Sequence, residues 1–144
     1  MTAPAFHHIA LNCRNMDATE AFYTKHFGFR RGRVIPLGNT KIVFLRLGEF
    51  YLELFDANQP EQATYQNDGP GVPGVIRHMA FKVDNVDKKL ADMGEDAKVT
   101  QGPMSFDAFI NGWRTAWISD PDGNIVEISQ GYMDGEGAAP FSLG

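Results

Sequence analysis

Two histidines and two glutamates stand at matching places in the sequence, and their types suit a divalent metal. His8 and His78 each open the pattern His–apolar–Ala–apolar–polar, and they lie about 70 residues apart. Glu53 and Glu127 each stand between apolar residues of a strand-like run. A carboxylate in such a place is costly unless it is paired or bound to a metal. Two neutral imidazoles and two carboxylates balance a divalent ion, so the sequence predicts one metal site with these four residues as ligands.

The donor set is compatible with Zn, Ni, Co, Mn or Fe. Four protein ligands on a six-coordinate ion leave two positions for water or substrate, which is typical of a catalytic metal. We therefore expect the ion to polarise a substrate oxygen while Glu53 or Glu127 moves a proton. Glu53 lies between Tyr51 and Phe55, and these drier surroundings favour it as the base, although the sequence leaves the choice open.

The elements that must position these residues also occur twice. The spacing that relates the histidines relates Asn15 to Asn85 and Asp17 to Asp87. Helices are expected over 17–27 and 87–93, and Asp17 with Glu20 predicts a capping box at the first of them. Three strands are expected after each helix, namely 29–35, 40–47 and 50–55 in the first half and 97–101, 114–119 and 125–129 in the second.

The duplication predicts an α+β fold of two tandem βαβββ modules that form one curved mixed sheet around a metal-binding cleft. We expect the first module over 1–56, a linker over 57–74, the second module over 75–130 and a C-terminal tail over 131–144. Neither half of the chain alone buries much core, because each half has only about 70 residues.

Alternation along the strands predicts which side chains share the face of the metal ligands. Asn12 has the parity of His8, and Lys82 has the parity of His78. We expect Asn12, Lys82 and Arg114 to bind a carboxylate or phosphate of the substrate. His7 has the opposite parity and is left out of the site.

Further residues are expected beside the site or in the core. Aromatic residues in or beside the connection 102–113 are predicted to cover the site or to join the core; they are Phe106, Phe109, Trp113 and Trp117. His26 falls on the helix, and Cys13 is expected to be a small buried hydrophobe.

Composition excludes several classes of protein. Hydrophobic residues make up 43% and charged residues 22% of the 144 residues, as in globular proteins and unlike disordered chains. The net charge is −5, and no run of Lys or Arg indicates a nucleic-acid partner. No apolar run is long enough for a membrane helix, and no signal peptide is evident. With one cysteine, Cys13, the simplest expectation is a cytoplasmic protein that binds a small molecule.

Several stretches resemble the vicinal oxygen chelate superfamily, which includes glyoxalase I, bleomycin-resistance proteins and extradiol dioxygenases. They follow the family order over nearly the whole chain and are HIALN at 8–12, AFYTKHFGF at 21–29, YLEL at 51–54, HMAFKV at 78–83 and DPDGNIVE at 120–127. The resemblance implies metal ligands at His8, Glu53, His78 and Glu127. It also implies a homodimer.

The resemblance leaves the reaction open. The four-ligand set is most similar to glyoxalase I, and also to methylmalonyl-CoA epimerase, whose second ligand is usually Gln where Glu53 stands here. Asn12 replaces the Arg that holds a glutathione carboxylate in bacterial glyoxalases, and Ala57 replaces an Asn. We expect a glyoxalase-like lyase or isomerase; the alternatives are an Fe(II) extradiol-type dioxygenase and a non-catalytic binder similar to bleomycin-resistance proteins.

Overall fold

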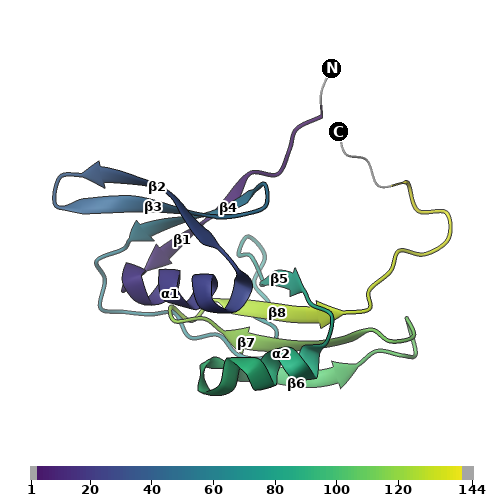
Figure 1. The fold of residues 1–144 in the computed structure, drawn as a ribbon. Helices are drawn as coiled ribbons and strands as arrows, with labels where there is room; N and C mark the ends of the chain where they lie inside the picture. The colour runs from purple at the N-terminus through teal and green to yellow at the C-terminus, as the bar shows by residue number, and fades with distance from the viewer. Residues whose placement is uncertain (1–2, 141–144) are drawn as a thin grey trace. The chain divides into compact units, whose positions relative to one another are not determined.

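The computed structural model describes residues 3–140, which divide into two compact units. The first unit runs to Gln59 and includes the chain from Asp134 onward, and the second runs from Pro60 to Met133. Each unit contains one βαβββ module, and Figure 1 shows each helix beside the strands of its own module. The α+β class and the two modules are therefore confirmed. The expected sheet is found as two four-stranded sheets, one in each module.

The first module has an interior strand that carries Glu53. Its strands follow the order β1-β4-β3-β2, with β1 parallel to β4 and the other pairs antiparallel. Glu53 on β4 stands between Ala10 of β1 and Phe44 of β3 in the register. The elements are β1 (His8–Cys13), α1 (Met16–Phe27), β2 (Arg30–Leu37), β3 (Thr40–Leu47) and β4 (Phe50–Asp56).

The second module repeats this topology around Glu127. Its strands follow the order β5-β8-β7-β6, again with one parallel pair, β5 with β8. Glu127 on β8 stands between Ala80 of β5 and Trp117 of β7. The elements are β5 (Met79–Lys82), α2 (Val86–Met93), a short 3-10 helix (Gly94–Asp96), β6 (Lys98–Ser105), β7 (Arg114–Ser119) and β8 (Ile125–Gln130).

The core of each module lies on one face of its sheet. Leu52 and Leu54 flank Glu53 and are fully buried, and Val126 and Ile128 flank Glu127 in the same way. Because successive side chains of a strand point to opposite faces, each glutamate points away from this core. Cys13 is also fully buried, as predicted.

The helix starts differ from the expected capping box. Asn15 and Asn85 are the N-cap residues, and the side chain of Asn15 accepts a hydrogen bond from the Ala18 backbone N–H at 3.1 Å. Glu20 is instead paired with Arg31 of β2 at 2.7 Å, and this hydrogen-bonded carboxylate raises the pKa of the Arg31 guanidinium. An Asn at this position caps the helix alone, and so the Asp17–Glu20 capping box is wrong.

Strand ends differ from the sequence prediction where edges and bulges decide them. Pro36 lies just beyond the expected strand 29–35 but belongs to β2, which is an edge strand and therefore tolerates a residue without an N–H group. β6 continues to Ser105, four residues beyond the expected end, with register shifts along its pairing with β7.

The segments outside the modules have no regular structure in the described part of the chain. Residues 57–78 contain no helix or strand, and neither do residues 131–140; residues 141–144 of the predicted tail lie outside the described residues. Within residues 3–140, no helix is long and apolar enough to cross a membrane.

The cap at Asn15 is testable. Asn15→Ala should lower the free energy of unfolding by about 1 kcal/mol, because the Ala18 N–H loses its acceptor. Urea unfolding measures the loss, and Asn39→Ala in the turn before β3 should change stability by less than about 0.5 kcal/mol. Equal losses in the two variants would contradict the cap.

Candidate functional site

The first module brings His8 together with Glu53. His8 is the first residue of β1, and its Nε2 lies 3.3 Å from Oε1 of Glu53 on the neighbouring strand β4. The glutamate side chain is 17% exposed and the histidine side chain 38% exposed. The pair is therefore open to solvent on the imidazole side.

His7, which the sequence analysis left out, contacts this pair. Its Nδ1 lies 2.8 Å from Nδ1 of His8, and its ring lies over that of Tyr51 with centroids 4.9 Å apart. Strand parity did not predict this contact, because β1 begins only at His8 and the residue before it does not follow the alternation. A hydrogen bond between two Nδ1 atoms needs a proton on one of them, so the tautomer of His7 is linked to the tautomer of His8.

The second module brings His78 together with Glu127. His78 Nε2 lies 2.8 Å from Glu127 Oε1, and the side chains are 21% and 13% exposed. His78 Nδ1 lies 2.7 Å from the carbonyl oxygen of Asp68. A carbonyl oxygen can only accept a hydrogen bond, so Nδ1 carries a proton. In a neutral imidazole the Nε2 lone pair then faces the carboxylate.

Glu127 has a further partner that Glu53 lacks. The Thr115 hydroxyl on β7 lies 2.9 Å from Glu127 Oε2 and 3.0 Å from the carbonyl oxygen of Ile128, and Thr115 is buried. The corresponding place in the first module, two residues before Phe44 on β3, holds Ile42, which has no hydroxyl group. The second carboxylate is therefore held at both oxygens, whereas His8 is the one partner of the first carboxylate among the described residues.

Each His–Glu pair has a separation that a bridging proton or a bridging cation can satisfy. A neutral Nε2 and a carboxylate oxygen about 3 Å apart place two lone pairs against each other unless a proton or a cation stands between them. Metal–nitrogen and metal–oxygen bonds are about 2.0–2.2 Å, and two such bonds near a right angle separate their donors by about 3 Å. The separations of 3.3 and 2.8 Å agree with neighbouring ligands on one ion.

The two pairs remain separate features of the two units. No group of three or more His, Cys, Asp or Glu side chains able to hold a metal is found within residues 3–140. The structure thus brings each histidine to the glutamate of its own module. The union of all four residues on one ion stays a prediction.

The predicted substrate residues lie in different surroundings. Asn12 on β1 and Lys82 on β5 are exposed. Arg114 donates to both carboxylate oxygens of Asp87 at 2.9 Å, and to the Ser105 hydroxyl at 2.9 Å. These contacts tie β7 to the first turn of α2, which favours a structural role for Arg114, and contact with a substrate stays a prediction.

The predicted aromatic cover lies within the second unit. The Phe106 and Trp113 rings are 4.9 Å apart, and Phe109 is largely exposed. Trp117 is buried across from Glu127, with its ring centroid 6.2 Å from that of His78. Among the described residues the Trp117 Nε1 atom is buried without a hydrogen-bond partner. This face of β7 therefore holds a donor that only a water molecule or a ligand can satisfy.

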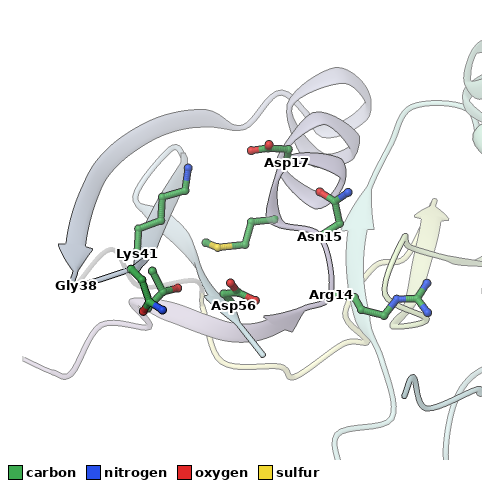
Figure 2. Close-up of a pocket in the computed structure, with 9 residues that line it drawn as sticks. Arg14, Asn15, Asp17, Gly38, Lys41 and Asp56 are labelled. Atoms are coloured by element: carbon green, nitrogen blue, oxygen red, sulfur yellow. The ribbon is translucent and has the colours of Figure 1, made fainter. Parts of the chain in front are cut away.

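A polar hollow of about 330 Å³ opens at the start of α1 in the first unit. Figure 2 shows Asp17 at the helix start, and Lys41 and Asp56 come from β3 and β4. None of the predicted ligands lines it, and the sequence analysis did not find it. Its lining side chains carry both signs of charge, and so it indicates no class of ligand.

The comparisons with known proteins agree with this fold. Residues 5–128 match the sequence profile of the Glyoxalase/Bleomycin resistance protein/Dioxygenase superfamily. The chain belongs to this superfamily. This confirms the resemblance drawn from the sequence motifs.

Three related proteins match this chain over nearly its whole length. YwkD of Bacillus subtilis strain 168, whose name calls it uncharacterized, is 29% identical over 89% of this chain and 98% of its own. The crystal structure of a glyoxalase family protein from Enterococcus faecalis is 29% identical, with a TM-score of 0.67 over 87% and 96% of the two chains. A lactoylglutathione lyase from Agrobacterium tumefaciens is 28% identical, with a TM-score of 0.59 over 91% and 96%. The superfamily thus includes enzymes.

The pair of Asp87 and Arg114 predicts a dependence of stability on pH. The hydrogen bond from Arg114 lowers the pKa of Asp87 below its ordinary value. The pair therefore stabilises the fold above the ordinary Asp pKa of about 4, and this contribution is lost as pH falls through the lower pKa of the folded state. The difference in Tm between the wild type and Asp87→Asn should shrink below about pH 4. Arg114→Gln should give the same profile, and a constant difference would contradict the pair.

The second oxygen of Glu127 gives a separate prediction. Thr115→Val keeps the shape of the side chain but removes the hydroxyl donor. The free energy of unfolding should fall by about 1–2 kcal/mol, because a half-buried carboxylate oxygen loses its partner. Urea unfolding of Thr40→Val, at the exposed start of β3, is the control and should differ from wild type by less than about 0.5 kcal/mol. No loss in Thr115→Val would show that Glu127 does not depend on the hydroxyl.

Proposed function

We propose that this protein is a metal-dependent enzyme, a glyoxalase-like lyase or isomerase that moves a proton next to the carbonyl group of a small molecule. The observation that carries the proposal is the meeting of an imidazole Nε2 with a carboxylate oxygen in each module, at 3.3 and 2.8 Å. The proposed ligands of one shared ion are His8, Glu53, His78 and Glu127.

The donor set decides the kind of ion. Two imidazoles and two carboxylates suit Zn, Ni, Co, Mn or Fe and balance a divalent charge. When bound, such an ion acts as a Lewis acid that polarises a carbonyl oxygen and makes the neighbouring carbon more acidic. The protonated Nδ1 of His78 leaves its Nε2 free to act as a ligand, which supports this use of the pair.

The two carboxylates have different contacts, and the difference favours Glu53 as the base. Glu127 is held by His78 at one oxygen and by Thr115 at the other. Glu53 has a longer contact with His8 and stands beside Phe44 in the register. A carboxylate with fewer fixed partners rotates more freely toward a substrate carbon, so Glu53 removes the proton and Glu127 remains a ligand.

Two exposed polar residues, Asn12 and Lys82, bind the substrate in this proposal. Asn12 shares the face of His8 on β1, and Lys82 follows Ala80 on β5 by two residues. Lys82 attracts an anionic group of the substrate, and the Asn12 amide donates a hydrogen bond to it. An uncharged Asn12 binds a carboxylate less strongly than an Arg does, so this position disfavours the glutathione adduct as the substrate.

The proposal includes a homodimer that acts on a small molecule in the cytoplasm. It includes no nucleic-acid partner and no membrane partner. The net charge of −5 supports the absence of a nucleic-acid partner. Dimerisation allows the four ligands of one ion to come from one chain or from two. Both arrangements give one ion for each chain, and so metal content does not depend on the choice.

Metal titration and one conservative variant test the proposal. Protein stripped with a chelator should bind one Zn²⁺ or Ni²⁺ per chain, with a higher Tm in the presence of metal. Two ions per chain would show that each His–Glu pair binds separately. Glu53→Gln should keep the fold and slow solvent deuterium exchange into α-hydroxy-ketones or acyl-CoA thioesters by about 10²–10⁴-fold. Glu127→Gln is the matched variant and should mainly weaken metal binding.

Other outcomes decide against the proposal. Unchanged exchange in Glu53→Gln would remove its role as base. Ring cleavage of a catechol in the presence of Fe²⁺ would favour the dioxygenase. No metal binding together with tight binding of an aromatic compound would favour a non-catalytic binder.

A further inference from the structure

The segment expected as a linker contains an ordered turn that contacts a proposed ligand. Residues 66–69 lie within the expected linker 57–74, and the Gly69 backbone N–H donates to the Gln66 carbonyl oxygen at 3.0 Å. The carbonyl oxygen of Asp68, in the middle of this turn, is the partner of His78 Nδ1 at 2.7 Å. Residues ten positions apart in the chain are thus joined by one hydrogen bond at the imidazole.

The turn is fixed on two sides by side chains. On one side, the Thr100 hydroxyl of β6 donates to the Asn67 carbonyl oxygen at 2.7 Å. On the other side, the Asp68 carboxylate pairs with Arg77 Nη1, with oxygens at 3.0 and 3.1 Å. Because Arg77 directly precedes His78, the ion pair holds the turn against the residues that enter β5.

Gly69 allows the turn to approach this closely. Its φ angle is +114°, which disfavours any residue with a Cβ atom. A Cβ atom at this position would also lie 1.8 Å from the carbonyl oxygen of Arg77 and 2.8 Å from its carbonyl carbon. The obstacle is backbone, which cannot swing aside as a side chain can. Only glycine therefore fits at position 69, where the turn packs against the backbone of Arg77 just before β5.

We propose that the Gln66–Gly69 turn is a positioning element for His78 and that Gly69 is the residue on which it depends. The Asp68 carbonyl keeps the proton on Nδ1 and directs the Nε2 lone pair toward Glu127. In the described part of the first module, the Nδ1 partner of His8 is instead another imidazole, which can donate or accept. The use of the directed lone pair for a metal rests on the proposed function, whereas the fixed tautomer does not.

Gly69→Ala tests the proposal, with Gly71→Ala as its matched control. At Gly71 the backbone lies outside the left-handed region, and an added Cβ would meet only Arg77 Nη2 at 4.0 Å. The first readout is the tautomer of His78, from long-range ¹H–¹⁵N correlation in the metal-free protein at mildly alkaline pH. Wild type and Gly71→Ala should carry the proton on Nδ1, and Gly69→Ala should show a mixture of the two tautomers.

The second readout is the affinity for Zn²⁺ in calorimetric titration. Gly69→Ala should raise the Kd about 10- to 100-fold, as losses of a second partner of a metal-bound histidine do, and Gly71→Ala should leave it within about twofold. If Gly69→Ala fails to fold, Thr100→Val replaces it, since it releases the Asn67 carbonyl without a change of shape. The tautomer mixture and a several-fold weaker affinity are then expected from Thr100→Val.

The outcomes separate this proposal from the function on which its last step rests. A protein that binds no Zn²⁺ but holds the Nδ1 proton in wild type and loses it in Gly69→Ala keeps the positioning element and removes the metal function. An unchanged tautomer in Gly69→Ala, or in Thr100→Val where that variant is needed, overturns the positioning element.

Discussion

A carboxylate in the interior strand of each sheet is the constraint around which both modules are arranged. Glu53 and Glu127 each stand between two fully buried residues of their own strand and between two neighbouring strands. A charge in such a place needs a partner, because little water reaches it. The partner in each case is a histidine where the adjacent parallel strand begins: His8 is the first residue of β1, and His78 directly precedes β5. The parallel pairing of the first and last strands of each module is what makes this meeting possible, since it places the start of one beside the middle of the other.

Duplication repeated the pair but not its surroundings. The second pair is held by a backbone carbonyl on the imidazole and a hydroxyl on the carboxylate, whereas the described partner of the first pair is a neighbouring imidazole. One half is therefore suited to rigid binding and the other to movement. This division supports the proposed roles of Glu127 as a ligand and Glu53 as the base.

Much of the fold follows from the sequence because its signals are local. Alternating apolar residues predict the strands, and the repeated His pattern predicts the two modules and the faces on which His8 and Glu53 lie. The contacts of Thr115, His7 and Asp68 cannot be predicted from the sequence. Thr115 depends on the register of β7 against β8, His7 lies outside the alternation, and the Asp68 carbonyl is a backbone group that no residue pattern reveals. The predicted capping box failed for a different reason, because Asn15 is an equally local candidate for the N-cap.

The burial of Cys13 has a practical consequence for the study of the first pair. It is the chain's single cysteine, its side chain is fully shielded, and it ends the strand that begins with His8. A thiol reagent reaches the sulfur only when this strand separates from its sheet. The rate of alkylation of Cys13 therefore measures how often β1 opens. The measurement needs no label on the protein.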